Sequence, residues 1–296
     1  MSIQNALPVY LIPFDSKYFL LGLSLLSNLK SYLKSFEMVY VLDFGLTKNQ
    51  IGFLKEYGVN VAPIPEELVG AHPYKIKSNI VTYLRNTNLI GRWIVFLDAD
   101  ILLLRSPVED IAKLIATMSS SKSKLAICQD MGPADSVGAF LDRFQNGTAK
   151  FKQYAKSYNL SLPYFNIGVV IFAPDFNFYE FKYLSERMEG EICWEQNAIN
   201  LMCLEGLNYL LLDPKIWNLH GSRLLDEYSE KDNPYIIHLT SSTDNLVQGP
   251  FDLMVEGKPF TFYYRYIKNM KIVQLQRQLL EKLAIDTAPL FLKYFS

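Results

Sequence analysis

Short apolar runs and longer helical repeats follow one another along the first part of the chain. Apolar runs typical of buried strands occur in "LPVYLIPF", "EMVYVLDFG" and "VNVAPIP". Between them lie "KYFLLGLSLLSNLKSYL" and "TKNQIGFLKEYG", whose spacing is helical. In the second helix Thr47 is the expected N-cap and Gly58 the expected C-terminal signal. This βαβαβ order predicts a parallel sheet covered by helices.

The same alternation continues beyond residue 70. We expect a helix over roughly 75–88 and then the strand "RWIVFLDAD". A further helix should follow, with Ser106 as cap, Pro107 at the first position and Glu109 completing a capping box. Residues 132–162 suggest a mostly helical, polar insertion. The later segments are the strands "KLAICQD", "YFNIGVVIFAP", "LNYLLLDPKIWNLH" and "PYIIHLT", and the helices "FYEFKYLSERM" and "CWEQNAINLMCLEG". We therefore predict one α/β domain with a Rossmann-like, mostly parallel sheet flanked by helices.

The last part of the chain differs from the rest. We place the main domain at 1–261 and a basic, aromatic helical extension at 262–296, which holds six Lys or Arg and two acidic residues. Its apolar positions near helical spacing are Ile272, Leu275, Leu279 and Leu283. We expect this extension to pack on the domain or on a second copy of the chain. The alternative is a peripheral contact with a membrane surface.

Composition narrows the class of protein further. The chain has 296 residues, of which 50% are hydrophobic and 20% charged, as in a globular protein with a large core. Its formal net charge of -1 gives no basic field for nucleic acid. Three cysteines at unrelated spacings argue against a disulfide framework and a zinc site. No apolar run approaches the ~18 residues of a spanning helix, and the first residues lack a basic leader, so we expect a soluble, cytoplasmic protein.

A pair of aspartates interrupts the apolar strand at 94–103. Asp98 and Asp100 follow "IVFL" and precede "ILLL". At i and i+2 they point to one side of a strand, about 7 Å apart, and two neighbouring carboxylates repel unless a cation lies between them. Oxygen ligands suit Mg²⁺ and Mn²⁺, and open α/β sheets bind ligands beyond the carboxyl ends of their strands. The pair by itself leaves a metal site and a solvated strand-end turn open as alternatives.

Three segments in order carry a family resemblance. "FLDADILLLRSP" resembles the D-x-D segment of nucleotide-sugar glycosyltransferases of the GT-A fold, and is similar to that of the glycogenin-like and bacterial galactosyltransferase-like group, family 8. "YFNIGVVIFAPD" resembles the group's N-x-G-V strand, with Asn166 and Gly168. "WEQNAINLM" resembles its D-Q-D-x-L-N helix start, with Glu195, Gln196 and Asn200. The resemblance runs from about residue 9 to 238 and implies a GT-A fold.

Two departures from the pattern affect the expected site. The group's third metal ligand is a histidine in H-x-x-G-x-x-K-P-W. Here "IIHLTSSTDN" offers His238 without the Gly or Lys, and "GKPF" comes about twenty residues later, at 257–260. His220, also after an apolar run, is the competing ligand. The last acid of D-Q-D is Asn197 in this chain.

The resemblance implies transfer of a hexose from a nucleoside diphosphate sugar, with UDP as the expected carrier. The acceptor would be a hydroxyl group of a saccharide, a lipid-linked molecule or a protein, and the cofactor Mn²⁺ or Mg²⁺. The implied metal ligands are Asp98, Asp100 and His238, and the implied catalytic residues are Glu195 and Gln196. The implied substrate-binding residues are Lys77, chosen over Lys75 and Arg85, together with Asp98, Ala99, Asn166 and Gly168. From position alone, Ile12, Phe14, Asp15 and Tyr18 at the end of the first strand should lie over the nucleotide base.

The stereochemical course and the class of protein have alternatives. The resemblance favours retention at the sugar; an inverting enzyme would need a base, for which Glu195, Asp135 or Asp244 could serve. A haloacid-dehalogenase-like phosphatase also uses a D-x-D, but near its N-terminus and followed by Thr or Val, whereas here "ILLL" follows. A nucleotidyltransferase would need a Gly-rich basic loop after the first strand. A non-catalytic domain that binds nucleotide sugars or glycans is the alternative outside the enzymes.

Overall fold

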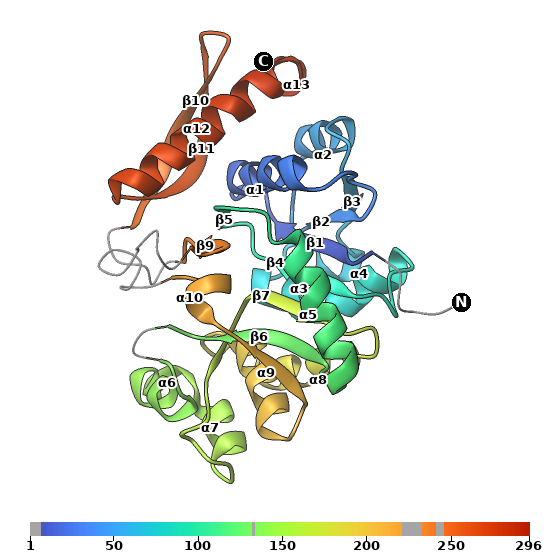
Figure 1. Ribbon diagram of the computed structural model, residues 1–296, viewed down its shortest axis with the longest axis vertical. Helices are drawn as coiled ribbons and strands as arrows, with labels where there is room; N and C mark the ends of the chain where they lie inside the picture. Colours follow the sequence, from blue (N-terminus) through green and yellow to red (C-terminus); the bar gives the residue numbers. More distant parts are fainter. Residues whose placement is uncertain (1–6, 132–133, 221–232, 241–245) are drawn as a thin grey trace.

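A seven-stranded sheet forms the centre of the molecule (Figure 1). The computed structural model describes residues 7–131, 134–220, 233–240 and 246–296. The strand order is β3-β2-β1-β4-β7-β6-β8; β7 runs antiparallel to both neighbours, and every other pair is parallel. The strands are β1 (Val9–Phe14), β2 (Val39–Asp43), β3 (Asn60–Ala62), β4 (Ile94–Leu97), β6 (Leu125–Gln129), β7 (Phe165–Phe172) and β8 (Tyr209–Leu212). The predicted α/β class with a mostly parallel sheet is confirmed.

Helices cover both faces of this sheet. They are α1 (Phe19–Tyr32), α2 (Lys48–Glu56), α3 (Pro73–Ser78), α4 (Ile80–Asn86), α5 (Val108–Ser121), α6 (Val137–Arg143), α7 (Ala149–Ala155), α8 (Phe178–Arg187), α9 (Trp194–Leu204) and α10 (Pro214–Trp217). Side chains alternate across β1, so Tyr10, Ile12 and Phe14 join the core beneath α1 and α2, while Val9 and Leu11 join the core beneath α4 and α9. Each fully buried side chain of this size contributes about 1.5–3 kcal/mol.

Local signals fix the ends of some helices and not of others. The Thr47 cap is confirmed. Its hydroxyl accepts a hydrogen bond from Gln50 N, and the side-chain oxygen of Gln50 accepts one from Thr47 N, which makes a full capping box. The box expected at Ser106 is absent. Pro107 occupies the cap position with φ -89° and ψ -2°, so α5 begins one residue later than expected. The Ser106 hydroxyl therefore reaches only Val108 N, at 3.5 Å.

The reversed direction of β7 brings polar residues to the carboxyl ends of its neighbours. Leu97 at the end of β4 pairs with Val169, and Asp98 N donates to Gly168 O at 2.8 Å. On the other side, Asp130 N, just beyond β6, donates to Tyr164 O at 2.7 Å. The start of β7 thus lies between two strand ends that each carry an aspartate.

A second, small ladder completes this edge. β5 (Ile101–Leu103) pairs antiparallel with β9 (Ile236–His238), and Ile101 lies opposite His238. Leu239 N also donates to Asp100 O at 2.8 Å. This register holds the histidine beside the aspartate pair, although about 140 residues separate them.

The C-terminal part begins with strands. β10 (Leu246–Val255) and β11 (Lys258–Ile267) form a hairpin, followed by α12 (Met270–Asp286) and α13 (Ala288–Phe295). The predicted helical extension from residue 262 is therefore wrong for 262–267, where aromatic side chains favour a strand. Helix α13 packs on α2, with the buried Phe291 ring centroid 5.0 Å from that of Phe53. Figure 1 shows the hairpin and α12 at one end of the molecule and α6 and α7 at the other. In the described part of the chain, no helix is both long and apolar enough to span a bilayer.

Candidate active site

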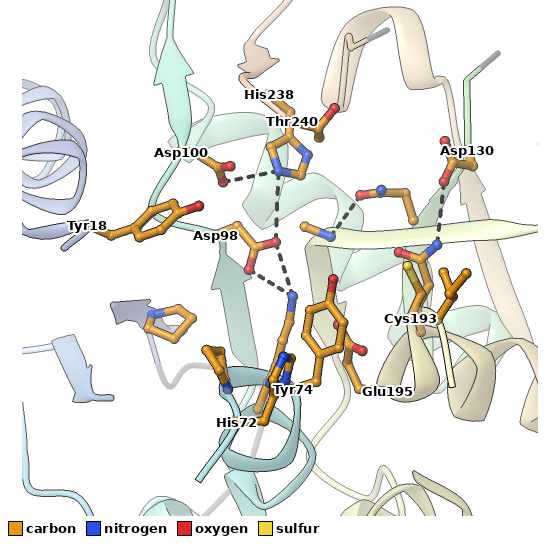
Figure 2. A pocket seen from close by; sticks show the side chains of 18 of the residues that line it. Tyr18, His72, Tyr74, Asp98, Asp100, Asp130, Cys193, Glu195, His238 and Thr240 are labelled. Carbon is orange, nitrogen blue, oxygen red and sulfur yellow. Dashed lines mark hydrogen bonds and ion pairs between the residues drawn. The ribbon is translucent and has the colours of Figure 1, made fainter. Parts of the chain in front are cut away.

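A cavity of about 840 Å³ opens at the carboxyl ends of β1, β4 and β6 (Figure 2). The predicted site residues that line it are Phe14, Asp15, Tyr18, Lys77, Asp98, Ala99, Asp100, Asn166, Gly168, Glu195, Gln196 and His238. Ile12 does not line the cavity: it is fully buried in the core beneath α1, two residues before the end of β1, whereas Phe14 at the strand end reaches the cavity. Its neighbour Pro13 lines the cavity instead.

Asp98, Asp100 and His238 point toward one another at the floor of the cavity, as Figure 2 shows. One ligand atom from each lies within 4.8 Å of the other two. The His238 Nε2 atom is 3.2 Å from Asp100 Oδ1 and 3.8 Å from Asp98 Oδ2. The sequence predicted these three residues together, and the structure brings them into one cluster.

Hydrogen bonds behind His238 determine which of its ring nitrogens carries the proton. Gly168 N donates to Asn166 Oδ1 at 2.9 Å, so the Asn166 oxygen is an acceptor. Asn218 Nδ2 donates to the same oxygen at 2.9 Å, which turns the Asn218 oxygen toward His238 Nδ1, 3.0 Å away. Nδ1 must therefore donate, and Nε2 is the ring nitrogen that faces the two aspartates.

This set of donor atoms fits a divalent metal ion. An imidazole nitrogen and two carboxylate oxygens converge here, and these are atoms that divalent metal ions accept as ligands. Two carboxylates and one imidazole are an ordinary set of metal ligands. The imidazole also has the usual orienting partner, because an amide holds its other nitrogen. The residues present can therefore hold Mn²⁺ or Mg²⁺.

Gly168 is required by the His238 ring. A Cβ at position 168 would lie 2.1 Å from His238 Cε1 and 2.6 Å from Nδ1. The group that approaches the backbone closely at this glycine is therefore the imidazole. The Asn166 amide oxygen is likewise used within the protein, by Gly168 and Asn218.

Two basic side chains neutralise the aspartates. Lys77 Nζ lies 2.9 and 3.1 Å from the two oxygens of Asp98, whereas Lys75 pairs with Glu189 away from the cavity. Although burial alone would lower it, Asp98 and Glu195 hold the pKa of Lys77 above its ordinary value.

Arg265, from β11, is the second cation and was not predicted. Its Nη1 donates to Asp100 Oδ2 at 2.5 Å and to Leu239 O at 2.9 Å, and its Nη2 donates to the Tyr18 hydroxyl. Although burial would raise it, His238 and Arg265 hold the pKa of Asp100 below its ordinary value. Arg265 is a single arginine in an aromatic strand. Nothing in the sequence indicates that it contacts an aspartate 165 residues earlier in the chain.

Two carboxyl groups on the far side of the cavity are less acidic than usual. Glu195, in the first turn of α9, is 4% exposed; burial raises its pKa to about 7, although Lys77 opposes the shift. Asp130 was missed by sequence reasoning, and burial raises its pKa to about 6. Gln196 lies between them along the wall, with Nε2 3.4 Å from Asp130 Oδ2.

The remaining residues of the α9 motif hold the helix against β7. Asn200 accepts from Phe165 N at 2.7 Å and donates to Phe165 O at 3.0 Å. Asn197 is fully buried and accepts from the Tyr164 hydroxyl at 2.7 Å. An amide at 197 therefore suits an apolar position without bringing charge into the core.

The other candidates are not part of the triad, although the His220 ring lies beside His238, with the ring centroids 5.9 Å apart. His220 is 1% exposed, and its Nε2 is 3.3 Å from Asp130 Oδ1; burial lowers its pKa to about 3. Asp135 is exposed and does not line the cavity, and Asp244 falls outside the described residues. The "GKPF" segment begins in the turn of the β10–β11 hairpin and continues into β11, where Lys258 is exposed and does not line the cavity.

The fold is the GT-A glycosyltransferase fold, as the resemblance implied. The WbbM bifunctional glycosyltransferase shares it with a TM-score of 0.61 and 14% identity over 99% of this chain and 52% of that one, so this chain spans about half its length. The galactosyltransferase LgtC, solved with donor and acceptor sugar analogues, gives 0.54 and 15% over 94% and 95%. Mouse xyloside xylosyltransferase 1 gives 0.50 and 12% over 80% and 99%. No family model and no curated protein matches the sequence. At these identities the likeness establishes the fold.

Proposed function

We propose that this protein is a metal-dependent glycosyltransferase that moves a hexose from a UDP-sugar to a hydroxyl acceptor. One observation carries the proposal: the ligand atoms of Asp98, Asp100 and His238 converge within 4.8 Å at the floor of a large cavity. The fold shared with WbbM and LgtC supports it. In the reaction the bond from the sugar carbon to the diphosphate oxygen breaks, a bond to the acceptor oxygen forms, and the proton of the acceptor hydroxyl passes to the departing diphosphate or to a base.

The chain's own groups suit the departure of a diphosphate. A divalent ion, when bound, would stabilise the negative charge that develops on the leaving group. Arg265 holds Asp100 Oδ2 and so directs Oδ1 of the same carboxylate toward His238. Phe14, Asp15 and Tyr18, at the end of β1, offer a surface for the nucleotide base.

The opposite wall suits the sugar and the acceptor. Gln196, Glu195 and Asp130 line it and can exchange hydrogen bonds with hydroxyl groups. We propose retention of configuration, following the resemblance of the α9 segment. If the reaction inverts, Asp130 joins Glu195 as a candidate base, because both line this wall and burial brings the pKa of each toward neutral pH. The anomeric configuration of the product, read by NMR, decides between the two.

Calorimetric titration tests the proposal. We expect UDP to bind the wild-type protein with Mn²⁺ and far more weakly without it, and Asp100→Asn to lose the metal-dependent part while remaining folded. GDP serves as the control nucleotide. Hydrolysis of a panel of nucleotide sugars without acceptor then identifies the donor. Phosphate release without metal-dependent nucleotide binding would indicate a phosphatase, and binding without any turnover would indicate a non-catalytic domain.

A further inference from the structure

The two cations beside the metal ligands are held very differently. The side chains of Lys77 and Arg265 are 12% and 9% exposed, so both charges are largely removed from water. Arg265 is fixed on several sides, by Asp100, by Leu239 O and by the hydroxyls of Tyr18 and Tyr263. Among the described residues, the ammonium of Lys77 donates hydrogen bonds to Asp98 alone, and the Phe96 ring centroid lies 5.1 Å away. Lys77 is therefore the cation that can turn away.

Lys77 occupies the oxygens that a metal ion would need. Its Nζ is within 3.1 Å of both carboxylate oxygens of Asp98, while Arg265 takes only Oδ2 of Asp100 and leaves Oδ1 facing His238. A metal ion coordinated by Asp98 would lie beside the Lys77 ammonium, and repulsion between the two cations favours the loss of at least one of the two Lys77 contacts. A lysine is suited to this, because its compact ammonium sits on a flexible four-carbon stem.

The charges make this exchange favourable only when an anion is present. Lys77 with Asp98, and Arg265 with Asp100, form two pairs with no net charge. A divalent cation alone would leave the pairs with a net positive charge in a poorly solvated cavity, and a diphosphate alone would leave a net negative charge. When the divalent cation and the diphosphate bind together, their charges nearly cancel. This state is favoured because an uncompensated buried charge is costly.

We propose that Lys77 couples metal binding to diphosphate binding, by competing with the metal ion for Asp98 and moving to a phosphate oxygen when both ligands are present. This rests on the proposed function and adds to it a residue that makes the two ligands bind cooperatively. Such coupling is reciprocal: the factor by which Mn²⁺ tightens UDP equals the factor by which UDP tightens Mn²⁺.

Lys77→Met separates this role from an ordinary phosphate contact. By titration of Mn²⁺ alone, the variant should bind the ion at least about fivefold more tightly than wild type, because Asp98 is freed. With saturating Mn²⁺, it should bind UDP at least about tenfold more weakly, because the phosphate partner is lost. Lys75→Met, which removes the exposed partner of Glu189, should change neither value. Lys77→Arg keeps a cation on Asp98 and should leave Mn²⁺ binding as weak as in the wild type. This variant is the second test if Lys77→Met does not fold.

Each outcome decides between the proposals. If Lys77→Met weakens UDP but leaves Mn²⁺ affinity unchanged or lower, Lys77 is a plain phosphate contact and the exchange is refuted. If Mn²⁺ tightens and UDP does not weaken, Lys77 only shields Asp98 and the coupling is refuted. If the wild-type protein binds no UDP at any Mn²⁺ concentration, the proposed function itself fails, whatever the variant does.

Discussion

Replacing Gly168 by alanine should remove His238 from the metal site. The new Cβ would lie 2.1 Å from Cε1 of the ring, and an ordinary contact is 3.4 Å or more, so the ring must retreat by about 1.3 Å. It has little room for this movement. His238 is 3% exposed, its Nδ1 is held by Asn218, and its backbone is paired with Ile101 in the β5–β9 ladder.

The size of the effect follows from the tolerance of metal coordination. Ligand distances in metal sites vary by only about 0.2 Å, so a retreat of more than 1 Å removes the imidazole as a ligand. We expect Mn²⁺ affinity to fall by about 10- to 100-fold, the range seen when a ligand loses its orientation. Overpacking of this kind should also lower the free energy of unfolding by about 1–3 kcal/mol.

A double-mutant cycle with His238→Ala tests the cause. Mn²⁺ titration and urea unfolding would be measured for Gly168→Ala, His238→Ala and the double variant. Once the ring is gone, the alanine at 168 should add almost nothing to either loss. Gly138→Ala is the matched control: its Cβ would come no closer than 3.2 Å to Leu160 O, and position 138 does not line the cavity. Unchanged Mn²⁺ affinity in Gly168→Ala, or a full additional loss in the His238→Ala background, would refute the steric reasoning.

Two further predictions concern groups around the triad. Glu195 has a pKa of about 7 in the folded protein, above its ordinary 4.5, so the folded state binds the proton more tightly. The stability from this group is complete below about pH 4.5 and is lost as pH rises to 7, by roughly 3 kcal/mol. Urea unfolding of Glu195→Gln across this range should lack that decline; an unchanged slope would show that Glu195 is not the group responsible. Asn218→Leu removes the acceptor for His238 Nδ1 and should weaken Mn²⁺ binding about 10- to 100-fold by titration, whereas Asn218→Asp keeps an acceptor and should lose less. Equal losses in the two variants would count against the proposed role of Asn218.

The sequence predicted the parts of the site whose signals are local. The strand "IVFL" and the aspartates that follow it lie within a few residues of one another, and strand geometry alone places both at one strand end. The order of strands and helices predicted the mostly parallel sheet in the same way. The prediction from position was wrong for Ile12, because this residue lies inside β1, two residues before the strand end that borders the cavity, and its side chain is buried in the core.

The rest of the site depends on pairings between distant segments. Two histidines followed apolar runs, and only the register of β9 against β5 selects His238 rather than His220. Asn218 reaches the site from the end of α10, and Arg265 reaches it from the C-terminal hairpin. No sequence motif predicts either contact. Asp130 joins them because β7 runs antiparallel and brings β4 and β6 to one edge. The sequence by itself determined most elements of the central sheet and the aspartate pair, since periodicity and spacing act over a few residues. Tertiary structure alone decided which groups surround that pair, because strand register and hairpin docking are set by contacts between residues far apart in the chain.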